Sequence, residues 1–273
     1  MDTRPIGVFD SGVGGLTTVR ELHKILPGEN IIYFGDTARV PYGTRSHETI
    51  CKYATQIIRF FSSREVKAIV SACGTISTNL SATEFSSAAG DIPYFTILQP
   101  SVDAAVSATR NKRIGVIATP ASIRTGAFEA RINTLIPGTE VIGVPCPLLV
   151  PLVENGMTGL DNKITRLTLE MYLEPVLKLG ADTLILGCTH YPLLTDIIAD
   201  IMPGVTLLDS GACAAKATKA ALEHDGKLCK GVGSTTYYVT DTVSNFVSVA
   251  NNFMFEDIAE QVRHIPIEAI DQY

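Results

Sequence analysis

One stretch of the chain decides the fold: Thr183-Leu184-Ile185-Leu186-Gly187-Cys188-Thr189-His190-Tyr191-Pro192. It begins as an apolar run, which is typical of a buried parallel strand. The run breaks at Gly187 and is followed by a cysteine, a threonine and a histidine, and Pro192 suits the start of a helix. Ligands of open α/β sheets bind at the carboxyl ends of the strands. The stretch therefore predicts a parallel sheet with a thiol at its ligand-binding edge.

A second stretch follows the same plan. It runs Val66-Lys67-Ala68-Ile69-Val70-Ser71-Ala72-Cys73-Gly74-Thr75, again an apolar strand that ends in a small residue, a cysteine and a threonine. Two similar strand ends, far apart in the chain, predict one site that faces two thiols. The separation of Cys73 and Cys188 also suits two comparable lobes with one cysteine each, related by a coarse pseudo-symmetry.

Length and composition limit the possible classes of protein. The 273 residues suffice for two modest domains, and 46% hydrophobic with 18% charged residues fits a globular protein with a sizeable core. The formal net charge of −6 argues against general binding to nucleic acid or to an anionic membrane. The sequence has neither a long uncharged apolar run nor a signal-peptide core, so we expect a cytoplasmic protein with reduced cysteines. No Cys-x-x-Cys pair indicates a zinc ribbon or a thioredoxin motif.

Apolar runs alternate with amphipathic segments along the chain. Strands are expected at 6–9, 31–34, 66–72, 93–98, 113–119, 140–144, 183–186, 205–208 and 236–240. Helices are expected at 16–26, 46–61, 77–89, 102–109, 122–135, 161–179, 192–201, 212–224 and 241–253. Ser46, Asp161 and Asp241 are the expected N-caps of three of these helices. The alternation implies an α/β fold with one mostly parallel sheet or two.

Two polar segments follow the first two strands. The glycine-rich turn 10–15 precedes a helix, so its backbone N–H groups could receive an anion. It matches neither a dinucleotide nor a Walker motif, Asp10 would repel a phosphate, and a purely structural turn fits equally well. The loop 35–45 is typical of loops that line a site, but a connector with a solvated Asp/Arg pair is at least as good an interpretation.

Several of these motifs together resemble a known family. Those that carry the resemblance are Asp10-Ser11-Gly12-Val13-Gly14-Gly15-Leu16-Thr17, Gly35-Asp36-Thr37-Ala38-Arg39-Val40-Pro41-Tyr42-Gly43, Ile114-Gly115-Val116-Ile117-Ala118-Thr119, the run from Leu173-Glu174-Pro175 to Cys188, and Gly187-Cys188-Thr189-His190-Tyr191-Pro192. They are similar to the signatures of glutamate racemases in the aspartate/glutamate racemase family. The match covers nearly the whole chain in the family's order.

The resemblance implies a fold and an activity. The fold would be two doubly wound, mostly parallel-sheet α/β domains related by a pseudo-two-fold axis, with the active site in the cleft between them. The expected division is residues 1–97 plus 208–273 for the first domain and 98–207 for the second. The activity would be the cofactor-independent interconversion of L- and D-glutamate, which supplies D-glutamate for peptidoglycan. The partner would be this small molecule, and a homodimer is compatible with the resemblance.

The resemblance also implies catalytic residues, and the chemistry explains them. Inverting Cα requires a base on one face and an acid on the other, which Cys73 and Cys188 would supply. A free cysteine has a pKa of roughly 8.5, so a modest shift makes thiolate available near neutral pH. Asp10 resembles the family's proton partner of the first thiol, and His190 that of the second.

The substrate-binding residues are expected to be Asp10, Ser11, Pro41, Tyr42, Gly43, Gly74, Thr75, Thr119, Thr189 and His190. Hydroxyl groups and amides at helix N-termini among them can hold a carboxylate. One position departs from the family, which has Cys-Asn-Thr where this chain has Cys73-Gly74-Thr75. We expect an asparagine at position 74 to fit and to tighten substrate binding. No lysine or metal-ligand cluster indicates pyridoxal phosphate or a catalytic metal, so no cofactor is expected.

Less specific interpretations apply to several residues. Cysteine is often simply buried, and Cys51, Cys146, Cys213 and Cys229 are expected to be inert. His23, His47, His224 and His264 are expected to be structural or solvated, and His190 itself could be a structural histidine. Glu154 could line the cleft or lie on the surface.

Two other functions remain open on the sequence. The nearer is a racemase for another acidic amino acid, such as aspartate, on the same scaffold. The other is a non-catalytic binding protein that keeps the fold. Binding alone needs no paired thiols, so the presence of both Cys73 and Cys188 argues against it.

Overall fold

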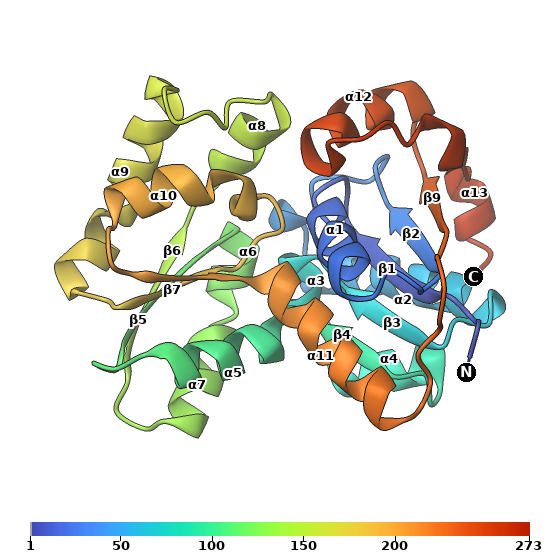
Figure 1. Cartoon of the computed structure of the whole chain (residues 1–273), viewed down its shortest axis with the longest axis horizontal. Coiled ribbons are helices and arrows are strands. Elements are labelled where there is room, and N and C mark those ends of the chain that lie inside the picture. The colour runs from blue at the N-terminus through green and yellow to red at the C-terminus, as the bar shows by residue number, and fades with distance from the viewer. Residues whose placement is uncertain (1) are drawn as a thin grey trace.

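Two separate parallel sheets organise the computed structural model, which describes residues 2–273 (Figure 1). The six-stranded sheet has the order β10-β9-β2-β1-β3-β4 and the four-stranded sheet has the order β6-β5-β7-β8. The strands of the first are β1 (Ile6–Asp10), β2 (Ile31–Gly35), β3 (Ala68–Ser71), β4 (Tyr94–Thr96), β9 (Thr235–Val239) and β10 (Val262–His264). Those of the second are β5 (Arg113–Ala118), β6 (Glu140–Pro145), β7 (Thr183–Leu186) and β8 (Thr206–Asp209). All pairs are parallel, which confirms the predicted α/β fold class.

Each sheet with its helices forms a lobe, and the two lobes lie side by side in Figure 1. The chain leaves the first lobe after β4, builds the whole second sheet, and returns after β8. The predicted division at 97/98 and 207/208 follows this path, although the second boundary falls inside β8, which pairs with β7. The division into domains remains a prediction.

Helices cover both faces of each sheet because successive strand residues point to opposite sides. In the first lobe, Val8 and Val70 pack on one face and their neighbours Phe9 and Ile69 on the other. The first face is covered by α1 (Leu16–Ile25), α11 (Ser210–His224) and α12 (Val243–Met254). The second is covered by α2 (His47–Ser63), α3 (Gly74–Asn79), α4 (Ala82–Ala89) and α13 (Ile267–Ile270).

The second lobe is built in the same way. Val116 and Ile185 face α5 (Leu98–Ala108) and α7 (Ala127–Leu135). Ile117 and Leu184 face the opposite side, with α8 (Leu149–Glu154), α9 (Lys163–Leu179) and α10 (Thr195–Ile201). The remaining elements are α6 (Pro120–Arg124) and the 3₁₀ turns η1 (Tyr42–Thr44), η2 (Tyr191–Leu194) and η3 (Ala259–Gln261). Among the helices of residues 2–273, none combines the length and apolarity needed to span a membrane.

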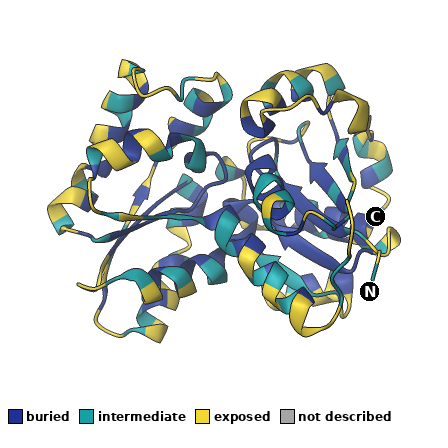
Figure 2. Ribbon diagram, in the orientation of Figure 1, coloured by how far each residue is buried: buried dark blue, intermediate teal, exposed yellow. Residues whose placement is uncertain are grey.

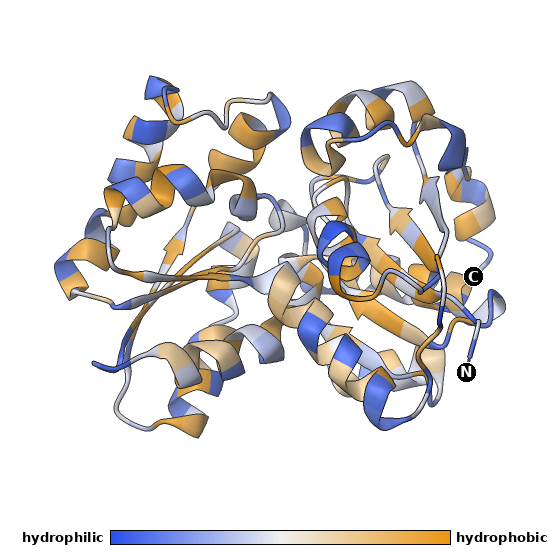
Figure 3. Ribbon diagram, viewed as in Figure 1, coloured by the Kyte–Doolittle hydropathy of each residue, from blue (hydrophilic) through white to orange (hydrophobic). Residues whose placement is uncertain are grey.

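Burial explains why the strands could be located from sequence. All residues of β1, β3 and β7 are buried, and Figure 2 shows the strands as the dark interior with exposed residues on the outer helices. The same strands are the apolar segments of Figure 3. A strand that is buried on both faces becomes a continuous apolar run, which is the pattern that predicted them.

Two of the predicted helices are each broken in the structure. The segment 77–89 was expected to be one helix, but α3 ends at Asn79 and α4 begins after Ser81. Ser81 and Glu84 form a capping box, which starts a new helix there. The segment 122–135 divides into α6 and α7 at Gly126, whose φ of 65° is left-handed.

Two helix N-caps also differ from the prediction. Asn162, not Asp161, caps α9 by accepting a hydrogen bond from the Thr165 N–H. The N-cap of α12 is Thr242, not Asp241, and no side chain caps it. Ser46 does cap α2, as predicted. The strand β10 and the helix α13 were not predicted, because a three-residue strand and a single turn of helix are too short to show a period.

Candidate active site

The carboxyl ends of strands from both sheets meet at one cavity between the lobes. Its volume is about 450 Å³. β1 ends at Asp10, β3 is followed by Cys73, and β7 is followed by Cys188. Every residue predicted for the site lines this cavity: Asp10, Ser11, Pro41, Tyr42, Gly43, Cys73, Gly74, Thr75, Thr119, Cys188, Thr189 and His190. The two strand ends that the sequence singled out therefore face the same enclosed space.

Cys73 is held at the N-terminal end of α3, where it is the N-cap residue. Only 5% of it is exposed, and its Sγ donates to Ser11 Oγ at 3.6 Å. Burial, and secondarily the negative charge of Asp10, raise the pKa of the Cys73 thiol to about 12. At neutral pH this group therefore carries its proton and is ready to act as an acid.

Asp10 lies beside that thiol and bridges the lobes. Its Oδ1 accepts from the Gly12 N–H at 2.8 Å, and its Oδ2 accepts from Thr189 Oγ1 at 3.4 Å. Burial raises the pKa of the Asp10 carboxyl, although the positive charge of His190 and these hydrogen bonds oppose the increase. A carboxyl group whose pKa is raised in this way can exchange a proton with a neighbouring thiol.

Cys188 is accompanied by a histidine and a glutamate. Its Sγ lies 3.8 Å from His190 Nδ1, and His190 Nε2 lies 2.9 Å from Oε1 of Glu154 at the end of α8. Burial alone would lower the pKa of His190, but its bonds to Cys188 and Glu154 outweigh that effect and raise the pKa to about 10. His190 is therefore an imidazolium at neutral pH, and it places positive charge beside the second thiol. Glu154, whose location the sequence left open, lies in the cleft.

The loop between β2 and α2 is fixed by a buried polar cluster. Asp36 is fully buried and accepts from Arg39 Nε at 2.7 Å, from Thr240 Oγ1 at 2.9 Å and from the Tyr42 hydroxyl. These bonds hold Pro41, Tyr42 and Gly43 against the cavity. The alternative of a solvated Asp/Arg connector is therefore wrong, since Arg39 is also buried.

Hydroxyl groups of both lobes meet on another part of the wall. Thr75 Oγ1 and Thr119 Oγ1 are 3.0 Å apart, and Thr119 also caps α6 by accepting from the Ser122 N–H at 3.3 Å. Hydroxyl and amide donors of this kind suit a bound carboxylate. The cavity thus combines two thiols, two proton partners and donors for an acidic ligand.

Residues 6–218 match the family described as Asp/Glu/hydantoin racemase. This match spans most of the chain. The chain belongs to the Asp/Glu/hydantoin racemase family. Within it, a glutamate racemase of Neisseria gonorrhoeae is 44% identical over 253 residues, covering 92% of this chain and 93% of the relative. A glutamate racemase of Geobacter metallireducens is 41% identical over 273 residues, covering 98% and 99%.

Solved structures that are similar to this chain include glutamate racemases of other organisms. The crystal structure of glutamate racemase from Francisella tularensis in complex with D-glutamate has a TM-score of 0.90 and 39% identity, and the match covers 100% of both chains. Glutamate racemase isoform RacE1 of Bacillus anthracis gives a TM-score of 0.91 at 33% identity, covering 98% and 99%. The chain is thus an amino-acid racemase, and the resemblance found in its sequence is confirmed.

Gly74 is the position where this racemase departs from the Cys-Asn-Thr pattern, and the expectation that an asparagine fits there was wrong. A Cβ atom at position 74 would meet the carbonyl oxygen of Gly187 far inside van der Waals contact, and would also reach Ile97 Cδ1 at 3.4 Å. Gly187 directly precedes Cys188, so its backbone cannot move without moving the second thiol. In this structure the two lobes approach each other through two glycines, and an asparagine at position 74 does not fit.

We therefore expect Gly74→Asn to destabilise the protein by about 1–3 kcal/mol, the usual cost of overpacking, and to raise KM for both enantiomers. Urea denaturation and steady-state kinetics would measure the two effects. Gly74→Ala is the matched control, because it adds the same Cβ without the amide. If Gly74→Asn lowers KM at unchanged stability, the proximity of Gly187 does not restrict this position.

Some residues that line the cavity of this racemase were not predicted. They are Gly12, Val40, Thr44, Pro120, Cys146, Pro147, Val150 and Pro151. Most are apolar or small and carry no chemical signal in a sequence. Cys146 was expected to be inert, and it is fully buried with its Sγ donating to the Val144 carbonyl at 3.4 Å.

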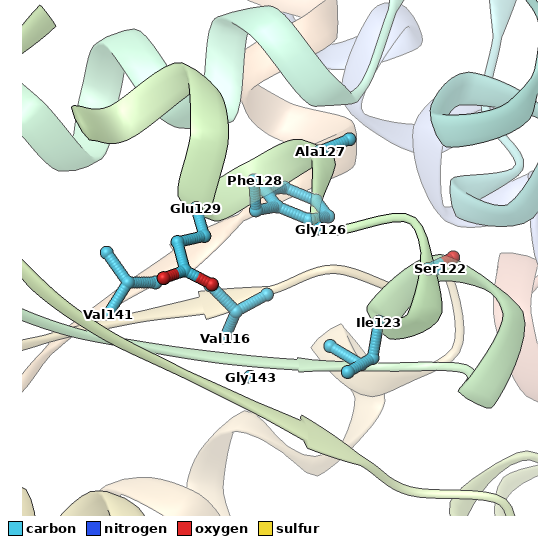
Figure 4. A pocket seen from close by; sticks show the side chains of 9 residues that line it. All are labelled: Val116, Ser122, Ile123, Gly126, Ala127, Phe128, Glu129, Val141 and Gly143. Atoms are coloured by element: carbon cyan, nitrogen blue, oxygen red, sulfur yellow. The ribbon is translucent and has the colours of Figure 1, made fainter. Parts of the chain in front are cut away.

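A smaller cavity lies within the second lobe, beside α6 and α7 (Figure 4). Val116, Val141 and Phe128 contribute its apolar wall, and Glu129 is its one ionisable side chain. Its lining residues include no thiol. They also include no pair of groups that could act as base and acid on opposite faces of a carbon. The cavity between the lobes is therefore the candidate active site of the racemase.

Proposed function

We propose that this racemase interconverts L- and D-glutamate by a two-base mechanism, in which Cys73 and Cys188 act on opposite faces of Cα. The reaction needs no cofactor. It takes place in the cytoplasm and supplies D-glutamate for peptidoglycan. The observation that carries the proposal is that two thiols, one from each sheet, line the same cavity. Each has its own proton partner, Asp10 or His190. Two acid–base groups on opposite faces can invert the carbon without rotating the substrate.

The electrostatic difference between the two thiols suggests a direction of proton transfer. Cys73 has a pKa raised to about 12 and keeps its proton, whereas the Sγ of Cys188 lies 3.8 Å from Nδ1 of the positively charged His190 ring. We therefore assign Cys188 as the base that takes the α-proton of L-glutamate. Cys73 then donates its proton to the opposite face of the carbanion. D-glutamate reacts by the reverse path, with Cys73 as the base.

The carbanion formed by this step has charge delocalised into the α-carboxylate. The proposed donors to that group are the hydroxyls of Ser11, Thr75 and Thr189, with Thr119 next to Thr75. Between turnovers Asp10 would return a proton to Cys73, and His190 would pass the proton taken up by Cys188 on to solvent. The loop residues Pro41, Tyr42 and Gly43 would contact the substrate, held in place by the buried Asp36 cluster.

Glutamate is the proposed substrate because relatives that are 41–44% identical to this chain are glutamate racemases, and a similar solved structure, that of Francisella tularensis glutamate racemase, is a complex with D-glutamate. Aspartate is the alternative, since the family includes racemases of both acids. The two acids differ by one methylene group. One methylene group in an enzyme pocket changes the free energy of transition-state binding by about 1–3 kcal/mol, which is a 10–200-fold difference in kcat/KM.

Circular dichroism of each L-amino acid, incubated with the purified protein and no added cofactor, would test this function. We expect the L-glutamate signal to decay to zero as the racemic mixture forms, and L-aspartate to react at least about tenfold more slowly. Faster conversion of aspartate would identify the other acidic substrate. No change for either acid would support the non-catalytic alternative. Growth of a D-glutamate auxotroph after expression of the chain would test the peptidoglycan role.

A further inference from the structure

A group of potential metal ligands lies outside the active-site cavity, where α2 meets α4. His47 and Cys51 are one helical turn apart on α2, and Glu84 is in the first turn of α4. Among residues 2–273, they are the one group of three or more His, Cys, Asp or Glu side chains whose ligand atoms all lie within 4.8 Å of one another. From the sequence we expected His47 to be structural or solvated, Cys51 to be inert, and no metal cluster. The fold brings together residues that are far apart in the chain.

The spacing of the three side chains agrees with a tetrahedral metal site. Bond lengths of about 2.3 Å to sulfur and 2.0–2.1 Å to nitrogen place two ligand atoms of a tetrahedral zinc site about 3.6 Å apart. Here Cys51 Sγ lies 3.7 Å from both ring nitrogens of His47, and His47 Nε2 lies 3.8 Å from Glu84 Oε1. Two sides of the triangle of ligand atoms are therefore already close to the length that a bound cation requires, and the third is within 4.8 Å.

The carboxylate of this group is oriented before any cation binds. Glu84 Oε2 accepts from the Ser81 N–H at 2.8 Å and from Ser81 Oγ at 2.6 Å, as part of the capping box. That arrangement leaves Oε1 free to face His47. A ligand that is held by a second hydrogen-bonding partner binds metal more tightly, because less freedom is lost on binding.

Cys51 is the most buried residue of the group, whereas His47 and Glu84 are more exposed to solvent. Cys51 is 9% exposed and its Sγ lies 3.9 Å from the Asn79 carbonyl oxygen at the end of α3. The side chains of His47 and Glu84 are 59% and 37% exposed. A cation could therefore enter from solvent, and the exposed His47 ring is free to turn a nitrogen lone pair toward it. Three protein ligands would leave one tetrahedral position for water.

We propose that His47, Cys51 and Glu84 form a binding site for a single borderline-soft divalent cation such as Zn²⁺, separate from the racemase active site. The ligands are the thiolate of Cys51, one imidazole nitrogen of His47, Oε1 of Glu84 and a water molecule. A mixed sulfur, nitrogen and carboxylate set suits zinc and disfavours Mg²⁺ or Ca²⁺, which take oxygen ligands. Binding releases the thiol proton of Cys51 to solvent. The bound cation connects α2 to α4.

Cobalt(II) provides a spectroscopic probe of the site. The full-length chain carrying Cys73→Ala and Cys188→Ala is the host for the titration, because the active-site thiols could also bind metal. We expect one equivalent of Co²⁺ to produce a thiolate-to-cobalt charge-transfer band, and Zn²⁺ to displace it. In this host, Cys51→Ser should abolish the band. His47→Ala and Glu84→Gln should each weaken Zn²⁺ binding by at least about tenfold, since even loss of an outer partner costs about 10–100-fold.

Matched controls separate ligand loss from damage to the fold. Glu84→Gln keeps a residue that is accepted in a capping box, so the thermal midpoint of its metal-free form should equal that of the host. His224→Ala and Cys213→Ser remove the same types of side chain elsewhere and should leave the affinity unchanged. Zn²⁺ should raise the thermal midpoint of the unmodified chain but not that of its Cys51→Ser variant. The proposal is overturned if the host shows no charge-transfer band, or if the band survives Cys51→Ser.

Discussion

Replacing Cys73 or Cys188 by alanine should abolish racemisation in both directions, with a loss of at least about 10³-fold in kcat. Each direction needs one thiol as base and the other as acid, and general acid–base groups contribute about 10²–10⁴-fold each. The two thiols lie in one cavity but on different sheets, so neither can replace the other. Chiral chromatography of products from each pure enantiomer would measure the effect, and Cys213→Ala, at a distant thiol, is the control.

Isotope incorporation tests the same prediction without a mutation. If two thiols act on opposite faces, the proton delivered comes from a group that never held the proton removed. In deuterated water, reaction from L-glutamate should place deuterium in the D-product first, while unreacted L-glutamate stays protiated early in the reaction. Transfer of substrate protium into product, or equal early labelling of both enantiomers, would indicate a single shuttling base. Near-full turnover of either alanine variant would equally exclude the two-thiol mechanism.

The charged state of His190 should make folding stability depend strongly on pH. Its folded-state pKa is raised from the ordinary 6.5 to about 10, because the bonds to Cys188 and Glu154 outweigh the effect of burial. A raised pKa contributes stability that is complete below pH 6.5 and is lost as pH rises through 10. A shift of this size corresponds to a contribution on the order of 5 kcal/mol at full extent.

Urea denaturation at a series of pH values between 6 and 10 would measure this contribution. The free energy of unfolding of the unmodified chain should fall across the range, and that of His190→Gln should fall much less. His264→Gln, an exposed histidine outside the cavity, is the control and should follow the unmodified chain. If the free energy of unfolding falls with pH equally in the unmodified chain and in His190→Gln, the imidazole is not held as a cation.

The sequence predicted the fold and the two thiols for a physical reason. Strands buried on both faces must be apolar along their whole length, so β1, β3 and β7 could be located directly. The ends of parallel strands share one edge of their sheet, which placed Cys73 and Cys188 at ligand-binding edges. The resemblance to glutamate racemases then supplied the remaining site residues, all of which line the cavity.

Features that depend on packing between distant segments were not predictable. The conflict at Gly74 arises from the backbone of Gly187, which no local pattern reveals. Glu154 reaches His190 only because α8 packs beside the end of β7, and the sequence left its position open. His47, Cys51 and Glu84 likewise meet only after α4 packs on α2. Helix breaks at Ser81 and Gly126 were missed because apolar periodicity continued across them.

The path of the chain between its two sheets restricts how this cavity can open. Two covalent connections, after β4 and after β8, join the lobes, whereas a single linker would let them separate in any direction. We expect two tethers to favour one motion, a rotation about the line through both connections. Such a hinge would bring the two thiols back to the same separation each time it closed, so the acid and the base would keep their register during substrate exchange.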